Sequence, residues 1–369
     1  MAKSKQSYAQ SGVDYSKMDP IKVLAQKKAK GTASQHKYFG NEEVGASRGE
    51  SAYVWEEADA YRSLVIEGLG TKNHIAHEMR KLTGKTHYDT LAKDTIAMIV
   101  NDLIVVGALP QVVNAYWALG ESKWLDDEER AQDLINGWAA ACEESGATWG
   151  GGETPTLVGT IDPSTIDLAG SAMGIIAPKK RLVLGDKLAA GDEIVIIESS
   201  GIHANGITLT RQIAKDLPEG FGTKMPNGEM FGEALLKPTH LYVQLVRDLM
   251  EQELELHYMV NVTGHGWRKL MRAQATFTYE FSVMPPVQPE FEFIQKAIDA
   301  SSEEMYGNYN MGAGFAIYVP AGTGRQVVET AKRHGLQAWV AGVVKTGPRK
   351  VIIKPKDITF DGETLEVRA

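Results

Sequence analysis

The sequence has little cysteine, no long apolar run and no surplus of positive charge. Its 369 residues include one cysteine, Cys142, which cannot form an intrachain disulfide or a cysteine-based zinc cluster. No segment approaches the ~20 consecutive apolar residues that span a bilayer, and the first residues, Met1–Ser7, lack the apolar core of a secretory signal. These absences predict a cytoplasmic protein with no membrane partner.

The charge balance argues against a further class of partner. The chain carries 39 Lys and Arg residues against 47 Asp and Glu residues, which gives a net charge of -8. Broad nucleic-acid binding requires a basic surface that replaces phosphate counterions, so we expect no nucleic-acid partner. One local site for a phosphorylated small molecule is compatible with this balance.

The length of the chain and the composition of its segments predict two domains after a polar arm. At ~100–200 residues per domain, a chain of this length predicts roughly two domains. Lys, Arg and Gly concentrate at Pro178–Gly191, where the apolar periodicity breaks. We therefore expect an N-terminal arm over 1–55, a first domain over 56–178 and a second domain over 190–369. Strands and helices mix in both halves, which predicts the α/β or α+β class.

Apolar spacing predicts individual elements in both halves. In the first half we expect a helix over 89–107 and strands at Tyr61–Ile66, Gln111–Leu119 and Ile166–Ala177. In the second half we expect helices from about Ile207 and over Thr239–Glu251, and strands at Glu193–Glu198 and Leu256–Val262, with further strands and helices up to Val351–Ile353. Asp126 and Glu129 have the spacing of a capping box, and Cys142 lies on the apolar face of the helix that they would begin.

The first segment with chemical content is Glu67-Gly68-Leu69-Gly70-Thr71-Lys72, after a predicted strand. Two glycines allow the backbone to approach an anion, and their N–H groups can point at phosphate oxygens. Lys72 adds a positive charge, and Glu67 could hold a cation. The alternative is a tight turn with a surface lysine.

The second segment is a predicted helix that carries Asp94, Asn101 and Asp102 among apolar residues. Positions 94 and 101 are seven residues apart and lie on nearly the same helical face. Buried carboxylates require a partner, and Mg²⁺ is suitable because it takes oxygen ligands and bridges phosphates. The alternative is that these residues form a solvated edge of the helix.

The third segment is Gly150-Gly151-Gly152-Glu153-Thr154. Three consecutive glycines cost conformational entropy, and a glycine-rich loop that ends in a carboxylate suits a magnesium–nucleotide site. A flexible linker is the alternative.

Three further loops follow predicted strands: Ser199–Gly206, Thr263–Gly266 and Asn308–Gly314. Loops at strand ends commonly bind ligands in α/β sheets. The first loop carries hydroxyl, imidazole and amide groups before a helix, which suits an anion or a ribose, and His203 could transfer protons. A helix cap with a hydrogen-bonded loop histidine is the alternative.

Taken together and in this order, these segments resemble one family. The matching residues are Ser7-Tyr8, Gly12-Val13-Asp14, Gly68–Lys72, Ala97–Asp102, Gly107–Pro110, Gly151–Thr154, Ser199–Gly206, Pro238-Thr239, Tyr242-Val243, Thr263-Gly264, Glu304–Tyr306, Asn310–Gly314, Ala338-Trp339 and Gly342. Over nearly its whole length the chain is similar to aminoimidazole ribonucleotide synthetase, or phosphoribosylformylglycinamidine cyclo-ligase, within an ATP-dependent superfamily. The segments from Ser199 to Trp339 favour the cyclo-ligase branch.

The resemblance implies a fold and an assembly. It implies a two-domain AIR-synthase-like fold in a homodimer. The N-terminal domains of two copies would pair their sheets into a β-barrel across the two-fold axis, and a mixed α/β C-terminal domain would flank each side. ATP, with Mg²⁺, would lie in the cleft between the domains.

The resemblance also implies a reaction, the conversion of formylglycinamidine ribonucleotide to aminoimidazole ribonucleotide in purine synthesis. An amide oxygen is a poor leaving group, so the ATP γ-phosphoryl group is first transferred to it. A nitrogen of the same substrate then attacks the carbon, phosphate leaves, and the imidazole ring closes. The phosphate charge must be held by cations, backbone N–H groups and Mg²⁺.

Matching positions carry the family's roles onto this sequence. The resemblance implies catalytic roles for His203, Lys72 and Asp102. It implies cofactor contacts by Gly68, Gly70, Thr71, Lys72, Asn101, Gly151, Gly152 and Glu153. It implies substrate contacts by Ser200, His203, Asn205, Thr263 and Gly264, and metal ligation by Glu67, Asp94, Asp102 and Glu153.

The chain departs from the family's pattern in the loops that contact ligands. Glu67 stands where the family has Asp, and Ala9 where it has Lys. Pro155–Val158 replaces an Ala-Glu-Met-Pro segment, and His265 interrupts a run of three glycines. Two other hypotheses therefore stay open, a divergent superfamily member that acts on a different amide and a nucleotide-binding protein without catalysis.

Overall fold

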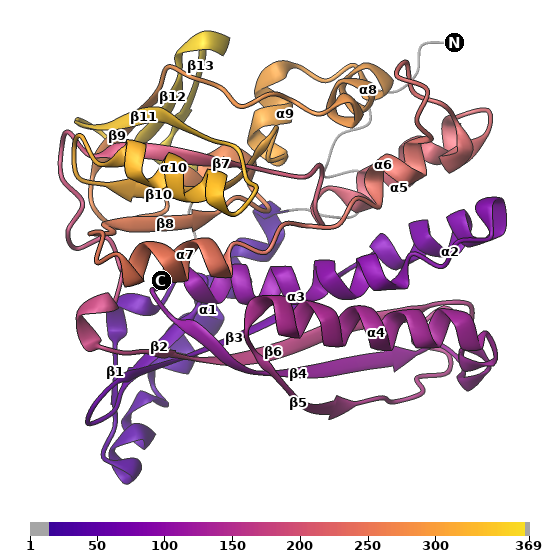
Figure 1. The fold of residues 1–369 in the computed structure, drawn as a ribbon, viewed down its shortest axis with the longest axis horizontal. Helices are drawn as coiled ribbons and strands as arrows, with labels where there is room; N and C mark the ends of the chain where they lie inside the picture. The colour runs from indigo at the N-terminus through magenta and orange to yellow at the C-terminus, as the bar shows by residue number, and fades with distance from the viewer. Residues whose placement is uncertain (1–14, 366–369) are drawn as a thin grey trace.

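The computed structural model describes residues 15–365, which form two β-sheets and their covering helices (Figure 1). The segments Ser7-Tyr8 and Gly12-Val13-Asp14, together with Ala9, lie outside the described residues. Of the helices within the described residues, none has both the length and the apolar character needed to cross a bilayer.

The first half forms a six-stranded sheet in the order β1-β2-β3-β6-β4-β5. Its strands are β1 (Glu42–Glu43), β2 (Tyr53–Glu56), β3 (Tyr61–Gly68), β4 (Leu109–Leu119), β5 (Thr148–Glu153) and β6 (Ile166–Ile176). Neighbouring strands are antiparallel except β4 and β5, which are parallel. The predicted strands at 61, 111 and 166 are confirmed.

Period-two alternation gives this sheet two different faces. Along β3, Ser63 and Val65 are buried whereas Leu64 and Ile66 are exposed, and the Ile66 side chain reaches 77% exposure. The buried face packs against α3 (Tyr88–Ile104), with α4 (Glu128–Ser145) packed on α3; α2 is Lys72–Thr83 (Figure 1). The sheet therefore presents exposed apolar side chains on the face opposite α3.

The second half forms a seven-stranded sheet in the order β13-β12-β9-β11-β7-β10-β8. Its strands are β7 (Glu193–Glu198), β8 (Tyr258–Asn261), β9 (Phe277–Phe281), β10 (Ala313–Val319), β11 (Ala338–Thr346), β12 (Lys350–Ile353) and β13 (Ile358–Asp361). Its helices are α5 (Ile207–Asp216), α6 (Phe231–Leu235), α7 (Val243–Glu251), α8 (Pro289–Ile298), α9 (Ser302–Asn308) and α10 (Gly324–Arg333). Two sheets with helices in both halves confirm the mixed α/β class.

The structure corrects three local expectations. Asp127, not Asp126, caps α4 by accepting a hydrogen bond from the Arg130 N–H at 3.1 Å. Residues 150–152 lie in strand β5 instead of a loop, and α7 begins at Val243 instead of Thr239. Within the N-terminal arm predicted over 1–55, the structure forms a 16-residue helix α1 (Tyr15–Lys30), the strand β1 and the start of β2.

Hydrogen bonds tie the two halves together. The Asn101 amide on α3 donates to the His240 carbonyl at 2.8 Å and accepts from the Tyr242 N–H at 3.0 Å. Because one side chain satisfies two backbone groups of the segment that enters α7, α3 fixes where the second half sits over the first. This contact creates the boundary along which the candidate site lies.

Candidate active site

A cavity of about 450 Å³ lies where β3, α1 and the second half meet. Its volume is in the range of small-molecule sites. The lining side chains are mostly polar or charged: Met18, Asp19, Lys22, Val23, Gln26, Glu50, Ser51, Glu67, Asp102, Asn205, Thr263, Gly264, His265, Lys269, Arg272 and Leu365. Five residues predicted from the sequence are therefore brought together here: Glu67, Asp102, Asn205, Thr263 and Gly264.

Two carboxylates define one side of the cavity. Glu67 lies near the end of β3 and Asp102 on α3, so a strand and a helix position them independently. The Asn261 amide donates to Asp102 Oδ1 at 2.6 Å. Burial, and then the charge of Asp102, raises the pKa of Glu67 to about 7. The negative charges of these two carboxylates repel each other, and a cation bound between them would relieve this repulsion.

Lys269 and Arg272, together with Lys22 on α1, give the cavity its positive charge. Lys269 belongs to the short 3-10 helix Gly266–Met271, and its Nζ donates to Thr263 Oγ1. Burial lowers the pKa of Lys269, and the Asp102 carboxylate opposes that shift. Arg272 donates to the Gly49 carbonyl at 2.9 Å and to Ser51 Oγ at 2.8 Å. Sequence reasoning missed both cations, although they lie three and six residues after the Thr263–Gly266 segment that it selected.

His265 lines the same cavity. Its backbone adopts the left-handed conformation, with φ of 70°, which non-glycine residues rarely occupy. Burial, followed by the charges of nearby Arg and Lys side chains, lowers its pKa to about 4, so the ring is neutral at pH 7. Its Nε2 lies 3.5 Å from Asp19 Oδ2 on α1. This departure from the family's three glycines therefore places an imidazole against the cavity.

Lys72 and Asp94, predicted to contact phosphate and metal, form a buried ion pair. Their charged atoms are 2.6 Å apart, and neither side chain is exposed. Lys72 also donates to the His203 carbonyl at 2.8 Å and to the Lys237 carbonyl at 3.3 Å, while Asp94 accepts two hydrogen bonds from Thr239. Protein groups therefore occupy the polar atoms of this pair, which lies where α2 and α3 meet the second half.

Three other predicted site residues also lie outside the cavity lining. Asn101 makes the contact between the halves described above. His203 is 2% exposed, and its Nε2 accepts the Ser200 N–H at 3.2 Å. Burial lowers the pKa of His203 well below its usual value, and Ser200 Oγ donates to the Pro238 carbonyl at 2.6 Å. In this geometry His203 is a hydrogen-bonded loop histidine that does not line the cavity.

The Asn308–Gly314 segment supports the same loop. Asn310 is buried, and its amide donates to the Gly201 carbonyl at 2.9 Å. Its Oδ1 lies 3.0 Å from Ser199 Oγ and accepts the Gly312 N–H at 3.0 Å. This segment therefore holds the 199–206 loop in shape.

The glycines after Glu67 shape the turn between β3 and α2. Gly68 ends β3, and Gly70 takes a φ of 70°, a conformation that favours glycine. Thr71 Oγ1 lies 3.4 Å from Thr208 Oγ1 at the start of α5. Gly68, Gly70 and Thr71 thus lie at the boundary of the two halves, beside the cavity but not in its lining.

Gly151, Gly152 and Glu153 are exposed on strand β5, at the edge of the sheet. Glu153 is in register with Tyr116 on β4, which pairs with Ala169 on β6, which pairs with Gly68 on β3. Neighbouring strands lie ~4.8 Å apart, so crossing three strand-to-strand spacings places Glu153 about 14 Å from Gly68 on β3. Within one chain, Glu153 therefore lies apart from the cavity that Glu67 lines.

The donor set of the cavity fits a magnesium–nucleotide complex. Mg²⁺ is commonly held by one or two carboxylates, with water and phosphate oxygens completing its shell, and Glu67 and Asp102 supply two. Among the described residues, no group of three or more His, Cys, Asp or Glu side chains is suited to hold a metal unaided. Lys269 and Arg272 supply cations for phosphate oxygens.

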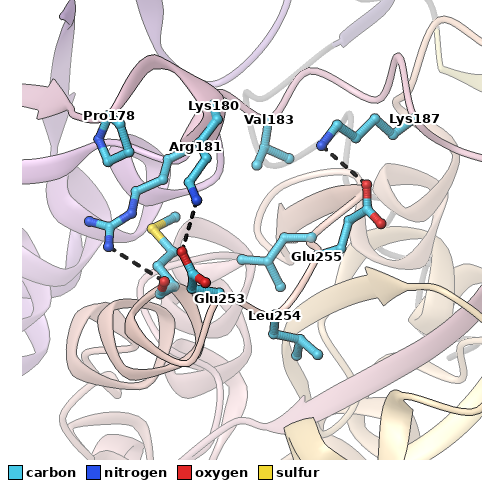
Figure 2. Close-up of a pocket in the computed structure, with 10 residues that line it drawn as sticks. Pro178, Lys180, Arg181, Val183, Lys187, Glu253, Leu254 and Glu255 are labelled. Carbon is cyan, nitrogen blue, oxygen red and sulfur yellow. Dashed lines mark hydrogen bonds and ion pairs between the residues drawn. The ribbon is translucent and has the colours of Figure 1, made fainter.

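A second cavity, of about 430 Å³, lies between the 178–187 segment and the end of α7 (Figure 2). Figure 2 shows that its cationic side chains are engaged. Lys180 pairs with Glu253 at 2.8 Å, and Lys187 with Glu255 at 3.2 Å. Arg181 donates to a backbone carbonyl of α7. None of the residues predicted to contact substrate, cofactor or metal lines this cavity, so it is a weaker candidate for phosphate chemistry.

The sequence matches two family models that together cover most of the chain. Residues 49–176 match the AIR synthase related protein, N-terminal domain, and residues 189–354 match the AIR synthase related protein, C-terminal domain. The chain therefore belongs to the AIR synthase related family.

Curated relatives narrow this assignment. The chain is 34% identical over 319 residues to the phosphoribosylformylglycinamidine cyclo-ligase of Carboxydothermus hydrogenoformans, which covers 83% of this chain and 88% of that protein. It is 33% identical over 362 residues to the enzyme of the same name from Methanobrevibacter smithii, which covers 97% and 99%. The chain belongs to the phosphoribosylformylglycinamidine cyclo-ligase family, and the resemblance stated from its motifs is confirmed.

Solved structures share the fold. A HypE–HypF complex aligns with a TM-score of 0.59 at 15% identity, covering 85% of this chain and 93% of that chain. Thiamine-monophosphate kinase from Stenotrophomonas maltophilia aligns with a TM-score of 0.57 at 17% identity, covering 82% and 88%. At these identities the likeness concerns the fold alone, and it agrees with the two-domain architecture implied by the motifs.

Proposed function

We propose that this chain is an ATP-dependent cyclo-ligase that converts formylglycinamidine ribonucleotide to aminoimidazole ribonucleotide in purine synthesis. The observation that carries the proposal is the cavity in which Glu67 and Asp102 face Lys269 and Arg272, in a chain that shares a third of its residues with cyclo-ligases over most of its length.

The proposal gives each cavity residue a task. Glu67 and Asp102 would hold Mg²⁺, which when bound would neutralise phosphate charge. Lys269 and Arg272 stabilise the negative charge that shifts between the phosphates and the amide oxygen during transfer. Asn205 and Thr263 line the cavity and can orient the substrate, so that its ring-closing nitrogen is held against the activated carbon.

A product assay tests the proposal. Purified protein is mixed with formylglycinamidine ribonucleotide, ATP and Mg²⁺, and we expect ADP, phosphate and the aminoimidazole product in equal amounts. Asp102→Asn should reduce turnover by more than a hundredfold while the protein stays folded, because a metal ligand is lost. ATP turnover with other amides but none with this substrate would contradict the proposal.

A second candidate is a divergent superfamily member that acts on a different amide. The observation that favours it is His265, an imidazole that lines the cavity where the family has glycine. A screen of amide-bearing metabolites for ATP-dependent phosphate release separates the two enzymes. A nucleotide-binding protein without catalysis would instead show ATP binding by calorimetry and no turnover with any substrate.

We further propose that the chain acts as a homodimer through the exposed face of its first sheet. Leu64, Ile66 and Met173 are exposed there, and Leu64 and Met173 are direct cross-strand neighbours. Apolar side chains gathered on one sheet face favour burial against a second copy. A dimer of this kind also offers a role for the β5 edge, since Glu153 could reach the partner subunit's cavity.

A further inference from the structure

We propose that a third cavity, between α2 and α5, binds a small amphipathic oxyanion, meaning an apolar ring or short chain that carries one phosphate or carboxylate group. The cavity has a volume of about 520 Å³ and is lined by α2, α5 and the turn at 219–221. It shares no lining residue with the candidate active site. The inference is therefore independent of the proposed cyclo-ligase activity.

Arg211 on α5 is the feature that points to an anion. Burial lowers the pKa of its guanidinium, yet among residues 15–365 this group has no hydrogen bond or ion pair. A guanidinium presents five donors in a planar fork that matches phosphate and carboxylate oxygens. Because a partly buried charge without a partner is unfavourable, an oxyanion in the cavity would recover the lost interaction.

The charged side chains that line the cavity sum to one positive charge. Lys81 is paired with Glu78 at 2.9 Å, so these two cancel. Arg211 and Lys215 then face Glu219, which leaves one positive charge in excess among the charged lining residues. Burial, together with the charge of Arg211, lowers the pKa of His74, which is therefore neutral and does not add to the field at pH 7.

The remaining surface of the cavity is apolar. Leu82, Ala214 and Phe221 line it, and the Phe221 ring stacks on Phe231, with centroids 6.4 Å apart and an angle of 23° between the planes. A cation beside a fixed apolar wall selects a ligand with both an anionic group and an apolar body. Among the described residues, the cavity in Figure 2 lacks such a free cation, because its lysines are paired with Glu253 and Glu255.

An occupant of this cavity would contact both halves of the molecule. α2 belongs to the first half and α5 to the second, and the two helices begin beside each other at Thr71 and Thr208. Binding would therefore stabilise the arrangement of the halves, and it should raise the melting temperature progressively as the ligand concentration increases.

The test uses full-length protein and two probes, 1-naphthyl phosphate and 1-naphthoate, with neutral 1-naphthol as the matched control. By titration calorimetry we expect one saturable site for at least one anion and at least tenfold weaker binding of the neutral compound. Arg211→Met should weaken anion binding at least tenfold. Arg325→Met, on the exposed surface of α10, should leave it unchanged, since that side chain is 87% exposed and belongs to none of the cavity linings described above.

Lys269→Met distinguishes this cavity from the candidate active site. If Lys269→Met abolishes binding of the probe and Arg211→Met does not, the anion binds in the active-site cavity and the inference is wrong. Absence of saturable binding to the wild-type protein, or equal affinity for 1-naphthol, would also overturn it. Loss of cyclo-ligase activity has no bearing on either outcome.

Discussion

Glu67 illustrates, at the scale of one residue, how tertiary structure changes the chemistry of a side chain. The sequence predicts a carboxylate that could hold a cation. The fold adds burial and the nearby charge of Asp102, which together raise its pKa to about 7. A carboxyl group with this pKa is half protonated at neutral pH, and a bound cation would displace its proton.

The first prediction concerns pH. Below pH 7 the Glu67 carboxyl is protonated, so the apparent affinity for Mg²⁺–ATP should fall by up to tenfold per pH unit as the pH decreases from 7 to 6. Glu67→Gln should bind Mg²⁺–ATP weakly at every pH and lose this dependence. Titration calorimetry from pH 5.5 to 8.5 measures both. A wild-type affinity that does not vary with pH would remove Glu67 from the metal site.

The raised pKa of Glu67 also affects stability, and this effect has the opposite pH dependence: a lower pH weakens Mg²⁺–ATP binding but favours the folded protein without ligand. The folded-state pKa of Glu67 lies above its value of about 4.3 in an unfolded chain, so the folded protein without ligand binds more protons between these values. Its contribution to stability is therefore present below about pH 4.3 and is lost as the pH rises through about 7. We expect Glu67→Gln to be more stable than wild type at pH 8.

Glu290 gives a second residue-scale prediction. It is fully buried on α8, and within the described part of the chain neither carboxyl oxygen has a hydrogen-bond partner. Burial raises its pKa. Replacing a buried carboxylate that has no partner by an apolar residue removes a desolvation cost. Glu290→Leu should raise the free energy of unfolding by about 1–3 kcal/mol at pH 8.

Urea unfolding measures this change, and Glu292→Leu is its control. Glu292 lies on the same helix but is exposed, so its substitution should change stability by less than about 0.5 kcal/mol. If Glu290→Leu destabilises the protein as a core substitution does, the buried carboxyl group contributes to stability and the prediction is wrong.

At the scale of elements, the sequence predicted whether a segment is a helix or a strand better than it predicted which other segments it contacts. Strand β7 could be predicted without period-two alternation, because Ile194, Val195, Ile196 and Ile197 form a short apolar run, and the structure places this strand inside its sheet. The glycines at 150–152 were harder to predict as a strand, because glycines carry no side-chain pattern. Only their pairing with β4 makes them a strand. The strand that pairs with this run, β4, lies far from it along the chain, so a local sequence pattern cannot identify that pairing.

The Lys72–Asp94 pair ties α2 to α3 and supports the third prediction. Removing one member leaves an uncompensated buried charge, so Lys72→Met or Asp94→Asn should destabilise the protein by about 3–5 kcal/mol. Lys93→Met breaks a partly exposed ion pair with Glu144 at 2.7 Å and should cost less than about 1 kcal/mol. Denaturant unfolding compares them.

The double variant Lys72→Met with Asp94→Leu separates packing from ligand binding. It removes both charges, so it should recover much of the stability lost in either single variant. If Lys72→Met instead retains full stability and loses only ATP affinity, the role first implied by the family resemblance is correct and the packing role is wrong.

At the scale of the whole molecule, the exposed sheet face predicts an assembly. Ile66→Asp places a charge on that face, and we expect it to convert a dimer to a monomer in analytical ultracentrifugation. Lys81→Asp, on the exposed side of α2, should leave the dimer intact. A wild-type monomer at micromolar concentration would contradict the proposal.

Mixed dimers test the proposed role of Glu153. If Glu153 acts on the partner's cavity, Glu153→Gln and Asp102→Asn should each be inactive alone. After the two proteins are mixed and allowed to exchange subunits, each mixed dimer holds one cavity with both native side chains, so activity should return to about a quarter of the wild-type value. No recovery would assign both residues to one chain's cavity or exclude Glu153 from the site.

The sequence by itself determined the family, the mixed α/β class and five members of the cavity, because ordered motifs and apolar periodicity are local properties. The domain division at 178–190 and a cytoplasmic location stay predictions. Only the tertiary structure decided which polar residues face the cavity. Lys72 and Lys269 are both lysines beside glycine-rich turns, yet burial against Asp94 removes one from the cavity, and the turn after β8 brings the other into it.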